Sequence, residues 1–576
     1  MKALLNPKLP TALLALLVLF HGCTTPPAQL TPPVEKLPAV STGGMVVSDA
    51  ALATRTGVEV LDHGGNAIDA AVATAFALAV AYPEAGNIGG GGFLVARLSN
   101  GTVLALDFRE KAPLAATERM YLDQKGSVTE ESQIGPLAAG VPGTVAGLWE
   151  AHQKYGALSW RQVVAPAIRI AREGFAPDRR MVQTLRADSS RLVRFKGSRE
   201  LFFTHALSEG QIWKNPDLAA TLDRIADHGM AGFYSGPTAE MIVEEMTKDG
   251  GILTLEDLKS YTAIWRNAIQ INYRGNTIIS MPPPSSGGVT LALICNILSG
   301  YDLRSIEWHS PKAIHLTAEA MRRAFAIRNE YLGDPDFVPI PIDTLLSPQF
   351  ALEQRSTISS DRASPSSTIS TRLGAGSREP RETTHLSVVD AQGNAVSLTT
   401  TLNGLYGNAV TVEGAGFLLN NEMDDFAAKP GFPNMFGLVQ GEANAIAPGK
   451  RMLSSMTPTI VLDSRSAPLL LTGARGGPYI ISAIFQVLSN IIDYGMDLPN
   501  AVIASRVHHQ HLPDSLEFEE RGMPEETLKQ LHALGYETTQ AGGLGSAPSI
   551  LRQNNRWIGF ADPRSGGTAE GQSRLP

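Results

Sequence analysis

The sequence predicts a globular protein of the α+β class, in which helices and strands build one large body. Of the 576 residues, 43% are apolar and 18% are charged, a balance typical of a chain with a sizeable core. An alanine-rich run at 67–80 and amphipathic patterns within 140–260 and 310–335 predict helices. Residues 384–390 and 395–401 alternate on either side of a short turn, which predicts a hairpin of two strands.

Charge and cysteine content exclude several classes of protein. The net charge is −8 and no long basic run occurs, so we expect no nucleic-acid partner. Two cysteines, Cys23 and Cys295, exclude a disulfide scaffold and a cysteine-rich metal site, and the apolar neighbours of Cys295 predict a buried core residue. His508, His509 and His511 lack the carboxylates that would complete a ligand set. We therefore expect no metal and no cofactor.

The first residues have the form of an export signal. Two lysines precede an apolar run at 13–20, which is too short to span a bilayer, so 1–22 predicts export to the periplasm. Gly22 before Cys23 is similar to the cleavage box of bacterial lipoproteins, although the two residues before it fit poorly. Cys23 is thus a candidate for lipidation, with ordinary secretion as the alternative. The Thr- and Pro-rich stretch 23–41 predicts an extended tether.

Three features of the chain after the tether indicate where a functional site lies. The four glycines at 89–92 lack the Lys-Ser/Thr of a phosphate-binding loop and predict a tight turn before a strand. A predicted strand at 103–108 ends directly before Arg109. Residues 356–382 are dominated by Ser, Thr, Arg and other polar residues, which predicts an exposed linker. This linker delivers Thr383 to the start of the hairpin.

Thr383 has a possible catalytic chemistry at that position. A threonine hydroxyl is a weak nucleophile and needs a base. If the chain were cut between Glu382 and Thr383, the new α-amine, with a pKa of ~7.7–8.0, would be that base. Threonines at strand starts are common, so on this evidence alone a purely structural threonine is the favoured interpretation.

Several motifs in a fixed order change that interpretation. Together they resemble the γ-glutamyltranspeptidase family, and the resemblance extends from about residue 42 to 565. The matching segments are 85–92, 107–110, 138–143, 383–390, 420–426, 453–458 and 473–477.

The resemblance implies a fold and a maturation step. It implies a four-layer αββα sandwich of the N-terminal nucleophile hydrolase type, made as a precursor that cuts itself before Thr383. The products would be a large subunit, 42–382, and a small catalytic subunit, 383–576, which share one body as a heterodimer.

The resemblance also implies the roles of individual residues. Thr383 would be the nucleophile that forms an acyl-enzyme, and the hydroxyl of Thr401 would support both self-cleavage and the nucleophile. The other implied residues are Asn403, Glu422 and Asp425 for the donor's α-amino end, Arg109, Ser454 and Ser455 for its α-carboxylate, and Gly476 and Gly477 for the oxyanion-hole backbone. Paired carboxylates suit an ammonium group, and a guanidinium can fork onto a carboxylate. The structural alternatives are a surface salt bridge for Arg109, helix capping for the carboxylates and a plain turn for the glycines.

A further segment, 429–451, resembles the lid loop over the donor site. Phe436 stands where relatives often carry tyrosine, and a phenyl ring lacks the hydroxyl's hydrogen bond, so we expect looser closure and easier access of water. Glu422 occupies a position that is glutamine in some bacterial relatives, and Glu382 before the cut is variable.

The sequence therefore predicts an exported, self-processing γ-glutamyltransferase and hydrolase. Its expected donor is glutathione, and the acceptor is water, an amino acid or a peptide. One alternative is a cephalosporin acylase that takes a glutaryl group; a glutaryl donor lacks the α-ammonium, so Glu422 and Asp425 argue against it. Another is a non-catalytic surface lipoprotein that keeps the fold for binding, which the complete set of matched site residues disfavours.

Overall fold

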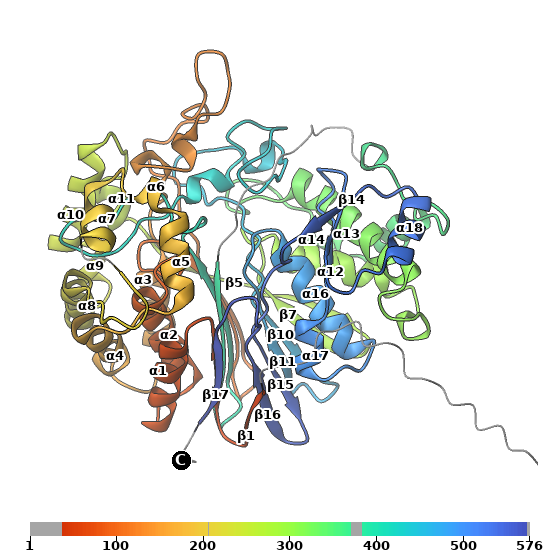
Figure 1. The fold of residues 1–576 in the computed structure, drawn as a ribbon, viewed down its shortest axis with the longest axis horizontal. Coiled ribbons are helices and arrows are strands. Elements are labelled where there is room, and N and C mark those ends of the chain that lie inside the picture. The colour runs from red at the N-terminus through yellow and green to blue at the C-terminus, as the bar shows by residue number, and fades with distance from the viewer. Residues whose placement is uncertain (1–36, 205–206, 370–382, 573–576) are drawn as a thin grey trace, which may run out of the picture.

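The computed structural model describes residues 37–204, 207–369 and 383–572. Two seven-stranded sheets lie face to face, with helices on both outer sides (Figure 1). The first sheet has the order β17 (Thr568–Gly571), β2 (Met45–Ser48), β8 (Thr384–Val389), β9 (Ala395–Thr401), β3 (Gly91–Arg97), β4 (Val103–Phe108) and β5 (Ile264–Arg266). The second has the order β1 (Ala39–Ser41), β16 (Arg556–Phe560), β15 (Ser549–Gln553), β11 (Pro468–Thr472), β10 (Thr459–Leu462), β7 (Asn276–Ser280) and β6 (Ile269–Tyr273).

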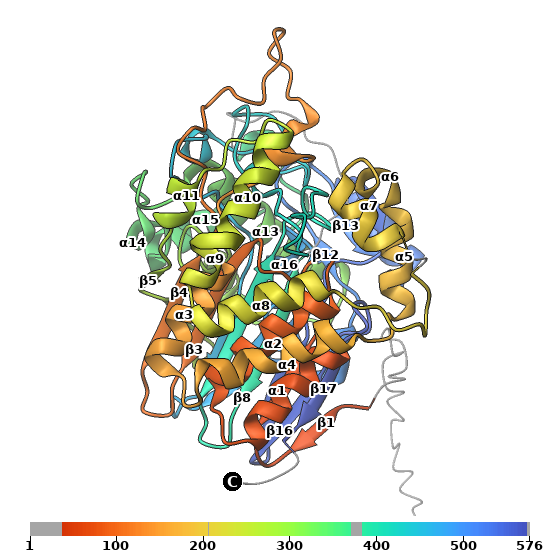
Figure 2. The same cartoon turned by 90° about the vertical axis from the view of Figure 1, so that its left-hand side faces the viewer.

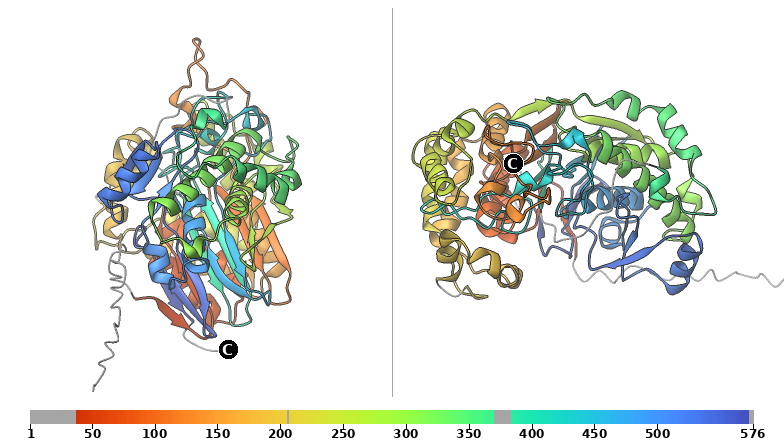
Figure 3. Two further views of the ribbon diagram at one scale, coloured as in Figure 1. Left: turned by 90° about the vertical axis from the view of Figure 1, so that its right-hand side faces the viewer. Right: turned by 90° about the horizontal axis from the view of Figure 1, so that it is seen from above.

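Helices cover the outer face of each sheet (Figures 1 and 2). Those on the side of the first sheet are α1 (Ala51–Asp62), α2 (Ala67–Ala81), α3 (Thr144–Tyr155), α4 (Trp160–Glu173), α5 (Arg179–Ala187), α6 (Ser189–Leu192), α7 (Lys196–Phe203), α8 (Pro216–His228), α9 (Ala231–Tyr234), α10 (Gly236–Lys248) and α11 (Leu255–Lys259). Those on the side of the second are α12 (Gly287–Leu298), α13 (Pro311–Tyr331), α14 (Ile342–Leu345), α15 (Pro348–Ser356), α16 (Tyr479–Ile492), α17 (Leu498–Ile503) and α18 (Glu525–Ala533). A small sheet joins β12 (Val507–His508), β13 (Leu516–Glu519) and β14 (Thr538–Ala541). Seen from above, the two groups of helices flank the sheets on opposite sides (Figure 3).

Both faces of the first sheet are buried. On β2, Val46 packs into the core shared with α1 and α2, whereas Met45 and Val47 pack into the core between the sheets. Because neighbouring side chains of a strand point to opposite faces, this division separates one core on each side of the sheet. The layers are helix, sheet, sheet and helix, as predicted.

The alanine-rich helix is confirmed as α2. The Asn66 side chain accepts hydrogen bonds from the backbone N–H groups of Ile68 and Asp69, and Asp69 accepts in return from the Asn66 N–H, a reciprocal cap. All residues of the predicted range 67–80 are buried. Small alanines let this helix pack closely on α1, β8 and β9.

The hairpin and the glycine turn are also confirmed. Strands β8 and β9 pair antiparallel, with Thr384 opposite Thr400. The chain bends at 88–90 and then enters β3. A Cβ atom on Gly90 would lie 2.0 Å from the carbonyl oxygen of Thr401, so glycine is needed there for close approach to β9.

The described part of the predicted linker is not uniformly exposed. Ser366 is buried: its hydroxyl accepts a hydrogen bond from Arg322 at 2.7 Å, and its N–H donates to Asp514 at 2.8 Å. Cys295 is buried in α12, as predicted. The export signal 1–22, Cys23, most of the tether and Glu382 lie outside the described residues. Among the helices that the structure describes, none has the length and apolar character needed to cross a membrane.

Candidate active site

One small pocket gathers all the predicted catalytic and donor-binding residues except Gly476. Its lining consists of Arg109, Thr383, Thr401, Asn403, Glu422, Asp425, Phe436, Leu438, Ser454, Ser455, Met456, Gly477 and Ile480. They come together because β8 begins, and β9 and β4 end, at the same edge of the first sheet. The cavity volume is about 20 Å³, which is room for a water molecule. The pocket is thus narrow.

Thr383 lies directly before β8 and is 4% exposed. The start of this strand is held by Asp49, whose carboxylate accepts from the Thr384 hydroxyl at 2.9 Å and from the His385 N–H at 3.2 Å. Each hydrogen bond to a carboxylate is stronger than one between neutral groups. Asp49 therefore fixes the backbone immediately after Thr383.

Thr401 ends β9 next to a sharp change of backbone direction. The N–H of Asn403 donates to Thr401 Oγ1 at 2.8 Å, and the Asn403 side chain donates to the carbonyl of Asn421 at 3.0 Å. Asn403 has a φ of 75°, a left-handed conformation that asparagine tolerates better than most residues. This turn brings Asn403 and Thr401 into the same pocket.

Arg109 is completely buried and forms ion pairs with both Glu422 and Asp425. Its Nη1 also lies 3.4 Å from a carboxylate oxygen of Glu110, and its Nε donates to the carbonyl of Met452 at 3.2 Å. Burial alone would lower the pKa of Arg109, but the surrounding carboxylates raise it above its usual value, so the guanidinium stays charged. The alternative of a surface salt bridge is therefore wrong.

Burial and Arg109 act in opposite directions on the pKa values of the three carboxyl groups of this cluster. Burial raises the pKa of Glu422 well above its usual value, raises that of Asp425, and raises that of Glu110 to about 7, while Arg109 acts in the opposite direction on all three. Glu422 Oε2 is buried and has no hydrogen-bond partner among the described residues. A positively charged group in the pocket would therefore bind favourably beside Glu422 and Asp425.

Gly476 and Gly477 form the turn that leads into α16. Their φ angles are 119° and 56°, both in the region that favours glycine. Gly477 and Ile480 line the pocket, so the amino-terminal end of this helix, with its partial positive charge, adjoins the site. That end of the helix can stabilise an oxyanion.

Nearly the whole described body matches one protein family. The sequence profile described as Gamma-glutamyltranspeptidase covers residues 53–572. The chain belongs to the gamma-glutamyltranspeptidase family. It is 44% identical over 559 residues to the glutathione hydrolase proenzyme of Escherichia coli (strain K12), with 95% of each chain covered. The predicted family is confirmed, and with it the prediction of an enzyme.

Solved structures agree with the fold. The cephalosporin acylase from Bacillus halodurans is similar with a TM-score of 0.83 and 27% identity, over 94% of this chain and 98% of that one. The gamma-glutamyltranspeptidase of Helicobacter pylori is 48% identical and covers 55% of this chain and 93% of its own, with a TM-score of 0.55. The predicted α+β fold of the N-terminal nucleophile hydrolase type is confirmed.

In this gamma-glutamyltranspeptidase, Phe436 of the segment 429–451 is 4% exposed and lines the pocket. The segment is tied down by Asp424, which accepts from the N–H of Met435 at 2.9 Å and from the hydroxyl of Ser132 at 2.7 Å. Burial raises the pKa of Asp424 to about 6. The segment thus packs against the site.

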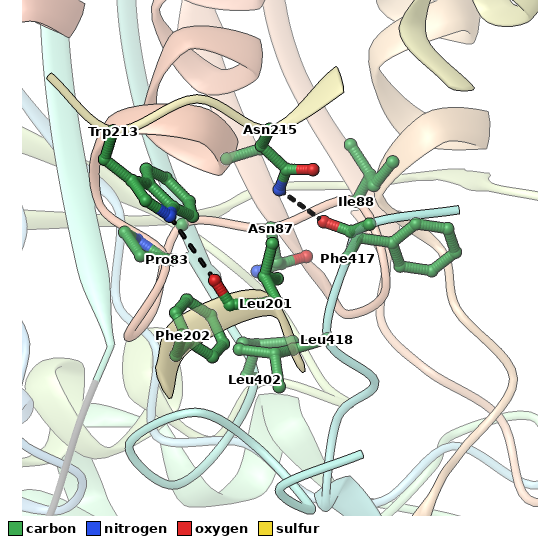
Figure 4. A pocket seen from close by; sticks show the side chains of 13 residues that line it. Pro83, Asn87, Ile88, Leu201, Phe202, Trp213, Asn215, Leu402, Phe417 and Leu418 are labelled. Atoms are coloured by element: carbon green, nitrogen blue, oxygen red, sulfur yellow. Dashed lines mark hydrogen bonds between the residues drawn. The ribbon is translucent and has the colours of Figure 1, made fainter. Parts of the chain in front are cut away.

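A second small pocket lies behind the glycine turn (Figure 4). Its polar groups are satisfied by backbone: Asn215 donates to the carbonyl of Gly416 at 2.8 Å, and the indole N–H of Trp213 contacts the carbonyl of Leu201 at 3.5 Å. Its volume is about 20 Å³, and most of its lining is apolar. It is a packing defect beside the site rather than a second site.

Sequence reasoning missed several residues that shape this site. Asp49 and Asn87 position the ends of β8 and β9, Glu110 adjoins Arg109, and Arg328 contacts Ser455. Asn87 and Glu110 belong to matched segments and could have been found there. Nothing in the pattern around Arg328 separates it from Arg322 and Arg323 on the same helix. No cluster of three or more His, Cys, Asp or Glu that could hold a metal ion occurs in the described parts of the chain.

Proposed function

We propose that the chain is a self-processing γ-glutamyltransferase and hydrolase that cleaves the γ-glutamyl amide of glutathione and related compounds. The observation that carries this proposal is the single pocket in which Thr383 lies beside Arg109, Glu422 and Asp425. An α-amino acid carries one ammonium and one carboxylate. The pocket offers carboxylates for the ammonium and a guanidinium for the carboxylate. The glutathione hydrolase proenzyme of E. coli supports glutathione as the donor and a cut precursor as the source of the enzyme.

The cut before Thr383 would divide the body into a large subunit, 42–382, and a small subunit, 383–576. Both parts contribute strands to each sheet: in the first, β8 of the small part pairs with β2, and β9 pairs with β3. On the second sheet β10 pairs with β7 and β16 with β1. These ladders support a heterodimer whose subunits stay together without a covalent link.

In the proposed reaction Thr383 Oγ attacks the γ-carbonyl of the donor, and the free α-amine of Thr383 takes the hydroxyl proton. The N–H groups of Gly476 and Gly477 stabilise the oxyanion; one lost donor of this kind costs ~10²–10³ in rate. The proton passes to the departing amine as the carbon–nitrogen bond breaks, which leaves a γ-glutamyl ester on Thr383. Water, or the amine of an amino acid or peptide, then attacks this ester; the α-amine takes its proton and returns it to Thr383 Oγ1 as the ester bond breaks. Thr401 Oγ1 supports the nucleophile in both halves.

Donor binding would rearrange the ion pairs of the pocket. The donor's ammonium binds to Glu422, Asp425 and Asn403, and its α-carboxylate binds to Arg109, Ser454 and Ser455. Both new charges are compensated, so the guanidinium and the carboxylates exchange internal partners for the two ends of the donor.

Export is part of the proposal. We propose that 1–22 is removed as a signal, that Cys23 is lipidated, that 23–41 tethers the body to a periplasmic membrane surface, and that 356–382 serves as the linker before the cut. Labelling with radioactive palmitate, compared between the wild type and Cys23→Ser, tests the anchor. Label in both proteins, or in neither, contradicts it.

Two donors test the activity against its closest alternative. A γ-glutamyl anilide and a glutaryl anilide differ only in the α-ammonium, and removal of that group leaves Glu422 and Asp425 buried without their partner. We expect kcat/KM to be about 100-fold higher for the γ-glutamyl anilide. A preference for the glutaryl anilide would indicate an acylase, and a purified protein that neither cuts itself nor releases anilide would indicate a binding protein.

A further inference from the structure

Arg328, on α13, lies behind the serine pair that lines the pocket and contacts Ser455. It is 1% exposed, and every hydrogen bond of its guanidinium goes to a neutral group. Nε donates to Ser286 Oγ at 3.2 Å, Nη2 contacts Ser455 Oγ at 3.4 Å, and Nη1 donates to the side-chain oxygens of Gln440 at 3.1 Å and Asn329 at 3.0 Å.

No carboxylate of the described residues forms an ion pair with Arg328, which sets it apart on its own helix. Arg322 and Arg323 are equally buried there, and both pair with Glu319. A buried charge without an ion-pair partner costs several kcal/mol. Burial lowers the pKa of Arg328 to about 10; the nearby Asp425 carboxylate opposes this shift, and Arg109 acts in the same direction as burial. The Arg328 guanidinium therefore remains a cation at neutral pH and would attract an anion.

The contacts of Arg328 also orient a hydroxyl that faces the pocket. Ser455 Oγ receives the Arg328 N–H and lines the pocket, so its own hydrogen is directed away from the arginine. Ser454 Oγ accepts from the N–H of Met456 at 3.1 Å, which frees its hydrogen in the same way. Ser286 receives the Nε–H of Arg328 and donates to the carbonyl of Ser454 at 2.7 Å, which holds the backbone of the pair. Both serines thus present hydroxyl donors to an anion in the pocket.

We propose that Arg328 is a positioning residue for the donor's α-carboxylate: it supplies a positive charge outside any ion pair behind Ser455 and aims the Ser455 hydroxyl into the pocket. This inference rests on the proposed function. Arg109 alone does not supply the positive charge that the donor's α-carboxylate needs, because Arg109 is already paired with Glu422 and Asp425. With Arg328 counted, the donor's carboxylate and ammonium each meet a charge of the opposite sign.

The test uses two donors that differ only in the α-carboxylate: a γ-glutamyl anilide and a 4-aminobutanoyl anilide. For Arg328→Gln we expect kcat/KM on the γ-glutamyl anilide to fall about 30-fold, mainly through KM, since the positive charge behind Ser455 and the orientation of its hydroxyl are lost. On the 4-aminobutanoyl anilide we expect less than about a 3-fold change. If that donor reacts too slowly to follow, its competitive inhibition constant replaces kcat/KM.

Lysine variants supply the second test and the control. Arg328→Lys keeps the positive charge but removes the planar guanidinium with its several N–H donors. We therefore expect a selective loss of about 5-fold in kcat/KM on the γ-glutamyl anilide. Arg323→Lys makes the same change at a buried arginine of α13 that is paired to Glu319, and it should leave the ratio of the two donors unchanged. Equal losses on both donors, or failure of every Arg328 variant to fold, would show a structural role and overturn the inference. A wild type inactive on the γ-glutamyl anilide would instead overturn the proposed function.

Discussion

The side chain of Asn87 donates a hydrogen bond to the backbone carbonyl of Thr401 at 2.7 Å. Its oxygen in turn accepts from the N–H of Gly90 at 2.9 Å and from the hydroxyl of Thr144 at 2.8 Å. These bonds link the glycine turn to the end of β9, which carries one of the two threonines of the site. The position of Thr401 therefore depends on a segment more than three hundred residues earlier in the chain.

Gly90→Ala should prevent self-cleavage, because its Cβ would lie 2.0 Å from the Thr401 carbonyl oxygen and would displace the end of β9. The ratio of uncut to cut chain on a denaturing gel measures the effect. Gly543→Ala is the matched control, since a Cβ there has no atom within 4 Å. Normal cutting of the Gly90 variant would mean that Thr401 tolerates displacement.

Asp425→Asn should change the choice of donor. The variant keeps the size of the side chain but removes a charge that we assign to the donor's ammonium. We expect kcat/KM to fall about 100-fold on a γ-glutamyl anilide and to change little on a glutaryl anilide, which has no ammonium. Equal losses of kcat/KM on the two donors would show that Asp425 does not bind the donor's ammonium.

Glu110 should make donor binding depend on pH. Burial raises its pKa from 4.5 to about 7, although Arg109 opposes this. Above pH 7 the carboxylate is charged and competes, along with Glu422 and Asp425, for Arg109, so KM for the donor should rise as pH passes through 7. In Glu110→Gln this rise should disappear, whereas the titration of the Thr383 α-amine should remain. An unchanged KM profile in the variant would refute the assignment.

The same shift gives a prediction for stability. The folded protein keeps a proton on Glu110 that the unfolded chain releases above about pH 4.5. The stabilising contribution is therefore complete below pH 4.5 and is lost as pH rises to about 7. Urea unfolding across this range should show a smaller decline in the free energy of unfolding for Glu110→Gln than for the wild type. An equal decline would contradict the assigned pKa.

Phe436→Tyr should shift the enzyme from hydrolysis towards transfer. The ring lines the pocket, and a hydroxyl there could form a hydrogen bond that tightens the covering segment against water. With a dipeptide acceptor present, we expect the ratio of transfer product to free glutamate to rise severalfold. Chromatography of the products measures this ratio, and a fall in it would show that Phe436 already closes the site.

The sequence predicted those parts of the structure that depend on local pattern or on ordered motifs. The run at 67–80 is α2, the alternation around 391–394 is the β8–β9 hairpin, and the matched segments converge on one pocket. These signals lie in neighbouring residues, so they can be read without the fold.

Other features depend on contacts between distant segments and could not be predicted. The glycines at 89–92 predicted a turn, but Gly90 is required because it approaches Thr401 closely. Ser366 lies in a polar stretch that predicted exposure, yet Arg322 and Asp514 bury it. Arg328 resembles its helical neighbours in sequence and differs from them only in its lack of a carboxylate partner among the described residues.

The central claim is that the chain cuts itself before Thr383 and uses that threonine as the nucleophile. Intact-mass measurement of purified wild type and Thr383→Ala tests it most directly. We predict two chains for the wild type, one of which begins at Thr383 and gains the mass of a γ-glutamyl group when a slow donor is added. The Thr383→Ala protein should be a single uncut chain without activity. Two chains in this variant, or a wild type that remains whole, would contradict the account.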